Sequence, residues 1–337
     1  MIVRPLVLCC AVLTGLRTVA EEPLPPSLVT RTIPIQQDVS GDGRPQKKLS
    51  SRALAREFEN VWQSFVEKFR TESDTKARLE LMKSYSKQAE KLLAPYVGED
   101  TIRRVMPVMA TTKLLDLDST FLAIAAKHPN DGVKATALLH FAEYLGNNRR
   151  SEELGVTLRH LRKKYGKLRF RRGTFASAAD EAGHFFKHLA VGCEAPATSG
   201  QDVDGTLFSL SDYQGKVVML RFWGDWCPAC RAMYPYERNI TRKYRNRPFA
   251  LIGVNSDPEK RCRNAQVHSD LTWRSFWDGG DTGGPIATLY QVEDWPRIII
   301  IDAQGTIRMN ARGLDEDYVS NLLDRLIREA EQNEIAE

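Results

Sequence analysis

Two cysteines, Cys227 and Cys230, stand one helical turn apart in the C-terminal half of the chain. They directly follow an apolar, strand-like run at 217–222, so the pair is expected where a strand gives way to a helix. At such a junction the first sulfur lies near the helix N-terminus, where unpaired N–H groups and the helix dipole favour a thiolate. The second sulfur is close enough to form a disulfide and release a bound partner. The spacing therefore predicts a dithiol that exchanges disulfides with another molecule.

Two prolines and the elements around them are expected to position this dithiol. Pro235 lies inside the helix that should begin near Pro228, where it removes a backbone donor and should kink the helix. Further along, Trp295-Pro296 comes directly before a strand-like run at 297–302, which suits a cis peptide bond that faces the site. The rest of the domain is predicted to be a hairpin turn at 302–305, a strand at 306–309 and an amphipathic helix at 315–331.

These features resemble the thioredoxin-like superfamily, and most closely its exported thiol-disulfide oxidoreductases of the TlpA/ResA type, which carry a redoxin or AhpC-TSA-like domain. The resemblance covers residues 191–332. It implies an α/β thioredoxin-like fold, with a central mixed sheet flanked by helices, in which Cys227 is the nucleophile, Cys230 resolves, and no cofactor is needed. The matching positions are Phe222-Trp223, Trp226-Cys227, Cys230, Pro235, Pro296 and the opening segments 192–196, 204–205, 210–213 and 215–218.

The segment departs from the family pattern where thioredoxins carry a buried Asp that helps to deprotonate the resolving thiol. Here that residue is Arg221, and a cation there is expected to stabilise a thiolate instead of accepting its proton. A buried Arg needs a partner, and Asp225 and Glu237 are the two candidates. Arg221, Asp225 and Glu237 are therefore predicted to tune the dithiol. Because of this departure, the redox potential typical of the family cannot be carried over.

Trp226, Trp295 and Pro296 are predicted to bind the partner. The resemblance implies that the Pro296 turn holds an extended backbone beside Cys227, while Trp226 supplies an apolar docking face. The leading prediction is an enzyme for thiol-disulfide exchange on disulfide-bearing exported proteins, working as a reductase that an upstream membrane dithiol protein recharges. One alternative is a thiol peroxidase of the peroxiredoxin type, although the Thr and Pro that precede the peroxidatic cysteine there are missing here. The other is a non-enzymatic binding protein that uses its helical domain as a scaffold.

The N-terminus predicts export. Residues 1–20 have a positive charge at Arg4, a short apolar run at 6–16 and small residues before Glu21, as a signal peptide does. The protein is therefore expected in the periplasm, with an uncleaved N-terminal membrane anchor as the alternative. Residues 21–50 are rich in Pro, Gly and charge and predict a flexible leader. Outside the signal, Cys193 and Cys262 accompany the dithiol, and whether they pair with each other or stay free is open.

Residues 51–172 predict an all-α domain, because apolar residues recur there at helical spacing with few strand signals between them. Within it, 121–165 resembles one tetratricopeptide-type helical hairpin, without a convincing second copy. A linker helix is expected at 173–190, ahead of the thioredoxin-like domain at 191–332 and a short tail at 333–337. The first predicted helix shows the pattern in Leu54, Phe58, Trp62, Phe65 and Phe69.

Charge is divided unevenly between the two halves. Residues 51–190 hold 25 basic and 17 acidic side chains, a net charge of +8, whereas residues 191–337 hold 17 basic and 22 acidic, a net charge of −5. The basic excess gathers at 159–172, which leaves three partners open: an anionic membrane surface, the acidic domain or an acidic protein. Export argues against nucleic acid. His184 and His188 share a helix face but lack a third ligand, so no metal site is predicted.

Overall fold

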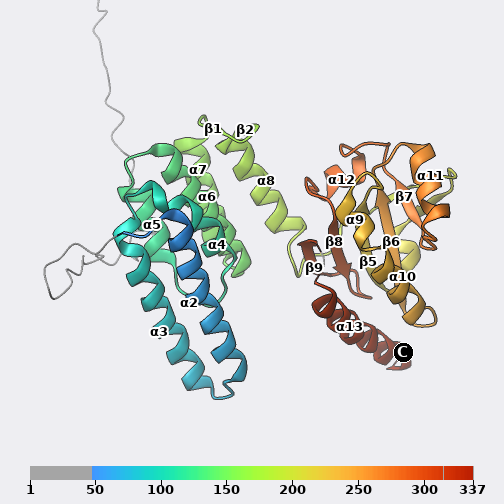
Figure 1. Cartoon of the computed structure of the whole chain (residues 1–337), viewed down its shortest axis with the longest axis horizontal. Helices are drawn as coiled ribbons and strands as arrows, with labels where there is room; N and C mark the ends of the chain where they lie inside the picture. Colours follow the sequence, from blue (N-terminus) through green and yellow to red (C-terminus); the bar gives the residue numbers. More distant parts are fainter. Residues whose placement is uncertain (1–47, 314, 337) are drawn as a thin grey trace, which may run out of the picture.

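A computed structural model describes residues 48–313 and 315–336 of the chain. The predicted signal peptide and nearly all of the predicted leader lie outside the described residues. The described part forms a helical lobe and an α/β lobe, and one helix runs from the first into the second (Figure 1).

Three helices of the helical lobe begin at a residue whose side chain caps them. Ser50, Asp74 and Asn130 each accept a hydrogen bond from a backbone N–H three residues ahead, which satisfies a donor that the helix itself leaves unpaired. The helices pack around one apolar core. In chain order the elements are α2 (Ser51–Thr71), α3 (Thr75–Leu93), η1 (Ala94–Tyr96), η2 (Asp100–Arg104), α4 (Met106–Thr111), α5 (Asp118–Lys127), α6 (Asp131–Asn147) and α7 (Ser151–Tyr165).

The segment 121–165, which resembled a tetratricopeptide-type hairpin, contains most of α5 and all of α6 and α7. Its assignment to that repeat family stays a prediction. The lobe departs from the all-α pattern at a short antiparallel hairpin made of β1 (Arg169–Phe170) and β2 (Gly173–Thr174). Two-residue strands are too short to leave a periodic signal in the sequence, which is why this hairpin was not expected.

Helix α8 (Phe175–His188) joins the two lobes (Figure 1). Its first turns bury Phe175 in the helical core. Leu189, directly after the helix, is fully buried in the core of the α/β lobe. The Nδ2 of Asn310 also donates to the Leu189 carbonyl at 3.0 Å. The predicted linker helix is therefore packed against both lobes.

The α/β lobe contains a five-stranded mixed sheet with the strand order β7-β6-β5-β8-β9. β5 lies at its centre, and all seven of its residues are buried. β6 and β7 run parallel to β5 on one side, and β8 runs antiparallel on the other, followed by β9. The strands are β5 (Val217–Trp223), β6 (Phe249–Asn255), β7 (Ser275–Trp277), β8 (Arg297–Ile301) and β9 (Ile307–Arg312), and a separate hairpin comprises β3 (Ser199–Gln201) and β4 (Leu207–Ser209).

Successive residues of β5 point to opposite faces of the sheet, and helices cover both faces. On the face of Met219 the apolar contacts come from α10 (Tyr234–Lys243), α11 (Glu259–His268) and α13 (Glu316–Ala336). On the face of Leu220 they come from α12 (Pro285–Leu289) and the segments before β5, which include η3 (Leu210–Tyr213). This is the predicted central mixed sheet flanked by helices.

The helix after Cys227 is broken as Pro235 predicts. α9 spans Pro228–Ala232, and α10 begins at Tyr234 with Pro235 in its first turn, where a missing N–H costs nothing. The break at Met233 separates the short helix that carries the dithiol from the longer helix that packs on the sheet.

The anchoring of α8 makes a prediction about two glycines. A Cβ on Gly146 would lie 2.3 Å from a ring carbon of Phe186 on α8, whereas a Cβ on Gly183 would meet only Leu158, at 3.5 Å. Gly146→Ala should therefore destabilise the protein by about 1–3 kcal/mol through overpacking. Gly183→Ala is the matched control and should stabilise it by about 0.5–1 kcal/mol, since alanine is the better helix former. Urea unfolding measures both, and an equal gain from the two changes would contradict the packing described.

Candidate active site around Cys227 and Cys230

The dithiol stands at the N-terminus of α9, directly after the loop that follows β5. Cys227 is the N-cap residue, and its Sγ accepts the backbone N–H of Cys230 at 3.2 Å. Cys227 is 4% exposed and Cys230 is fully buried, and the two sulfurs are not bonded to each other. Cys227 is therefore the sulfur closer to solvent, and a helix N-terminus is available to stabilise its charge.

The two sulfurs are not equivalent. Burial, together with the hydrogen bond with Cys227, raises the pKa of Cys230 to about 12, while the charge of Arg221 acts in the opposite direction. Cys230 is consequently a protonated thiol at neutral pH. It needs a proton acceptor before it can attack a disulfide.

Beneath the dithiol lies a buried ion pair between Arg221 of β5 and Glu237 of α10, both fully buried. The Nε of Arg221 faces Oε1 of Glu237, and its Nη2 donates to the Cys230 carbonyl at 2.7 Å. The guanidinium also lies 5.5 Å from the ring centroid of Trp223 and 5.4 Å from that of Tyr234. Burial raises the pKa of Glu237 to about 7, against the attraction of Arg221.

Of the two candidates, Glu237 is thus the partner of Arg221, and Asp225 is not. Asp225 sits on the loop before Cys227, where its Oδ2 lies 3.3 Å from Nε of Arg261 on α11. The Oδ1 of Asp225 accepts the hydroxyl of Tyr234 at 3.4 Å, so this carboxylate is engaged by Tyr234 and Arg261. Among the hydrogen bonds of the described residues, Arg221 donates to the Cys230 carbonyl and to neither sulfur.

One further residue of the site, not predicted from the sequence, is Asp257, a fully buried carboxylate two residues after β6. Its oxygens accept the backbone N–H groups of Asp225 and Trp226, the two residues before Cys227. A carboxylate just past the end of a strand, beside the strand that carries the dithiol, was the available signal, since strand ends collect functional side chains.

The predicted docking residues meet at the same edge of the sheet. Trp226 is 39% exposed, and its ring centroid lies 6.0 Å from that of the half-buried Trp295. The Trp295–Pro296 peptide bond is cis, as predicted. Arg297 pairs with Phe222 across β8 and β5, so the Pro296 turn lies level with the end of β5, from which the dithiol loop departs.

Other predicted features lie apart from this cluster. Cys193 is half-buried and Cys262 buried, and both are free, with burial raising the pKa of Cys262 to about 12. The rings of His184 and His188 are 4.8 Å apart, and residues 48–313 and 315–336 hold no group of three or more side chains suited to a metal. In the predicted basic cluster, the side chains of Lys167, Arg169, Arg171 and Arg172 are exposed around the β1–β2 hairpin.

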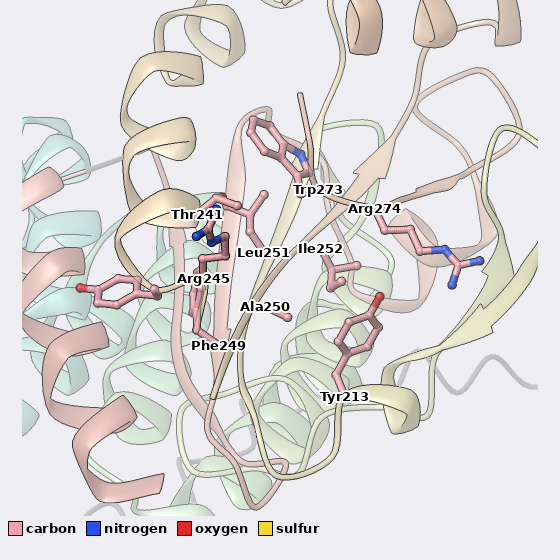
Figure 2. Close-up of a pocket in the computed structure, with 10 residues that line it drawn as sticks. Tyr213, Thr241, Arg245, Phe249, Ala250, Leu251, Ile252, Trp273 and Arg274 are labelled. Carbon is pink, nitrogen blue, oxygen red and sulfur yellow. The ribbon is translucent and has the colours of Figure 1, made fainter. Parts of the chain in front are cut away.

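A cavity of about 200 Å³ opens beside the first half of β6, between Thr241 of α10, Arg245 just after that helix, and the loop residues Trp273 and Arg274 (Figure 2). That half of β6 pairs with the start of β5, at the opposite end from the dithiol. The cavity is therefore not part of the Cys227 site. No helix among the described residues has both the length and the apolar character needed to cross a membrane.

Comparison with known proteins places the C-terminal lobe in a family. The model of the AhpC/TSA family matches residues 191–310. The thiol-disulfide oxidoreductase ResA of Bacillus thuringiensis subsp. konkukian is 31% identical over 134 residues, which cover 39% of this chain and 76% of the relative. The ResA of Bacillus subtilis is 28% identical over 121 residues, covering 35% and 65%.

Among solved structures, the thioredoxin domain of a thiol-disulfide oxidoreductase from Bacteroides vulgatus is 28% identical, with a TM-score of 0.38, and covers 41% of this chain and 99% of that one. The family model matches the lobe that carries the dithiol, and 76% of the first relative's length is covered. The chain therefore belongs to the thioredoxin-like thiol-disulfide oxidoreductases of the TlpA/ResA type and is an oxidoreductase.

Proposed function

We propose that the protein reduces disulfides in exported proteins through Cys227 as the nucleophile and Cys230 as the resolving cysteine. The observation that carries the proposal is the asymmetry of the pair. Cys227 caps a helix, and its sulfur accepts a backbone N–H. Cys230 is fully buried, and its carbonyl accepts a hydrogen bond from Arg221. The first sulfur is thus placed to attack a partner, and the second to attack only the first.

The exchange has two steps that balance. The Cys227 thiolate attacks one sulfur of the partner disulfide, forms a mixed disulfide, and the partner's other sulfur leaves as a thiolate that takes a proton. Cys230 then loses its proton and attacks Cys227, so the partner leaves with its second thiol and Cys227–Cys230 becomes the disulfide. Two electrons pass from the dithiol to the partner. An upstream dithiol protein in the membrane must return them.

The second step needs a proton acceptor, because the pKa of Cys230 is about 12. Glu237 is the candidate acceptor, since burial raises its pKa to about 7 and Arg221 connects it to the Cys230 backbone. We infer that this ion pair does the work of the buried Asp that thioredoxins carry at the position of Arg221. A carboxyl with a pKa near neutrality can both take and return a proton at physiological pH.

The ion pair also supports the reducing direction. A cation aimed at a thiolate stabilises the reduced dithiol and makes the disulfide a stronger oxidant. Here Glu237 and the Cys230 carbonyl engage the guanidinium of Arg221, so that stabilisation is weakened. The dithiol is accordingly proposed to donate electrons.

Partner binding is proposed at the exposed Trp226 ring, with Trp295 and the Pro296 turn holding an extended segment beside Cys227.

The proposed location is the periplasm, which rests on the export signal predicted at residues 1–20. The basic segment 159–172 is proposed to face an anionic membrane surface. These assignments of partner and place extend the oxidoreductase activity to exported substrates.

Trapping the mixed disulfide tests the two cysteine roles. With oxidised insulin as the partner, Cys230→Ser should accumulate a covalent Cys227–insulin adduct, because the resolving sulfur is missing. Cys227→Ser should give none and should lose insulin reduction. Non-reducing electrophoresis and mass spectrometry of the adduct provide the readout, and Cys193→Ser serves as the control that should behave as the wild type.

An adduct formed by the Cys227→Ser variant would contradict the assigned roles. Peroxide consumption is measured in parallel with the same proteins. Wild-type consumption of hydrogen peroxide faster than insulin reduction would instead favour the peroxidase alternative.

The raised pKa of Glu237 predicts a pH dependence of stability. The folded protein holds this proton more tightly than the unfolded chain, whose carboxyl has the ordinary value of 4.5, with about 7 in the fold. The resulting stabilisation is complete below pH 4.5 and is lost as the pH rises through 7. It should amount to roughly 3 kcal/mol. Urea unfolding between pH 4.5 and 8 should show this decline in the wild type and a flatter curve in Glu237→Gln.

The same variant tests proton transfer. If Glu237 accepts the Cys230 proton, Glu237→Gln should slow the decay of the mixed disulfide at neutral pH by about 100-fold. Glu316→Gln, at an exposed Glu at the start of α13, is the matched control and should change neither result. An unchanged decay rate in Glu237→Gln would exclude it as the acceptor.

A further inference from the structure

We propose that Asp257 is a positioning residue, which fixes the loop 224–226 from below and so presents Trp226 to the protein partner. The inference rests on the proposed exchange function and deepens it, because it identifies what holds the docking surface in place. Asp257 makes no contact with either sulfur among the hydrogen bonds of the described residues. It is argued to act through the loop that precedes Cys227.

The Asp257 carboxylate is fully buried, and both of its oxygens are used. Oδ2 accepts the backbone N–H of Asp225 at 2.6 Å and the Nδ2 of Asn255 at 2.8 Å. Oδ1 accepts the backbone N–H of Trp226 at 3.3 Å and lies 3.4 Å from Nε of Arg261. One side chain thus satisfies two successive backbone donors of the loop.

Every neighbour of this carboxylate is a donor, which sets a sharp chemical requirement. An Asn at the same position would turn one oxygen into an NH₂ group that must face two other donors, whichever way the amide is rotated. A buried donor facing donors costs the full desolvation penalty of the groups involved. Only a carboxylate therefore fits Asp257's place without disturbing the loop.

The residues around Asp257 hold the Trp226 ring as well as its backbone. Ser256 accepts the indole N–H of Trp226 at its Oγ, at 3.3 Å, and in turn bonds the Trp223 carbonyl through its N–H at 3.0 Å. The Asp257 carbonyl accepts the indole N–H of Trp277 at 2.9 Å. The turn 255–257 is thus tied to β5 and β7, so the loop is braced against the sheet.

Arg261 of α11 closes the arrangement from outside. Its Nε lies 3.3 Å from Oδ2 of Asp225 and 3.4 Å from Oδ1 of Asp257, and the side chain is about half exposed. The guanidinium therefore joins the loop carboxylate to the buried one. Since Arg261 is at the surface, changing it tests the brace without opening the core.

Bracing has a direct consequence for recognition. Trp226 is the exposed apolar ring beside Cys227, and a ring already held in its binding orientation loses less conformational freedom when a partner docks. A small disulfide reagent reaches Cys227 without covering the Trp226 face. Loosening the loop should therefore weaken reaction with a protein disulfide much more than reaction with a small one.

The test compares Asp257→Asn with Asp281→Asn, a matched change at an exposed carboxylate that accepts only the N–H of Gly283. Each full-length protein is assayed for insulin reduction with dithiothreitol as the reductant. For dithionitrobenzoate, each protein is first reduced and freed of dithiothreitol, and the rate of its single-turnover reaction with the reagent is measured. Asp257→Asn should lose about 10- to 100-fold in kcat/KM for insulin, mainly through KM, while its rate with dithionitrobenzoate changes by less than about twofold. Asp281→Asn should match the wild type with both probes.

Two outcomes would overturn the inference: an Asp257→Asn protein with wild-type kcat/KM for insulin, or equal losses with the two probes. If Asp257→Asn fails to fold, Arg261→Gln takes its place and should show the same selective loss to a smaller degree. A wild-type protein inactive with both probes would instead refute the proposed function. Hydrogen exchange tests the inference separately from the proposed function. The backbone N–H of Trp226 should be protected in the wild type and unprotected in Asp257→Asn. An unprotected N–H in the wild type would reject the positioning role of Asp257 whatever the activity.

Discussion

A buried ion pair between Arg221 and Glu237 lies beneath the dithiol, in a core whose other side chains are mostly apolar. Taking Arg221 and Glu237 out of water costs several kcal/mol for each ion, and their attraction and the bond to the Cys230 carbonyl offset this only in part. The remainder appears in the raised pKa of Glu237, which lies near 7. The same pair holds α10 against β5 and α9 above both, so the chemistry of Cys230 and the packing of the lobe depend on one interaction.

The site is assembled from segments far apart in the chain because the sheet brings their ends together. The loop after β5 carries Trp226 and Cys227, the turn after β6 supplies Asp257, and the segment before β8 supplies Pro296. Parallel pairing of β5 with β6 aligns their carboxyl ends, and antiparallel pairing with β8 places the start of that strand at the same edge. The helix break before Pro235 then fixes the direction of α10, and so the position from which Glu237 reaches Arg221.

Much of this arrangement could be predicted from residue types at short spacing. The dithiol, the helix break and the turn at Pro296 are local signals, and the apolar run at 217–222 predicted a strand, which is the central one of the sheet. The choice between Asp225 and Glu237 as the partner of Arg221 could not be made, because it depends on which face of β5 receives α10. Asp257 was missed because its place after a strand end is only a weak local signal, and its contacts with the loop depend on β5–β6 pairing. The β1–β2 hairpin has strands of two residues, too short for a period to be seen.

We propose that the Cys227–Cys230 dithiol is an electron donor whose thiolate Arg221 does not strongly stabilise. The measurement that tests it most directly is the equilibrium redox potential of Cys227–Cys230 in the mature protein, by alkylation and mass spectrometry in glutathione or dithiothreitol buffers. We expect a redox potential of roughly −270 mV, as in thioredoxin. A value near roughly −120 mV would identify an oxidant with a strongly stabilised thiolate and would contradict the account.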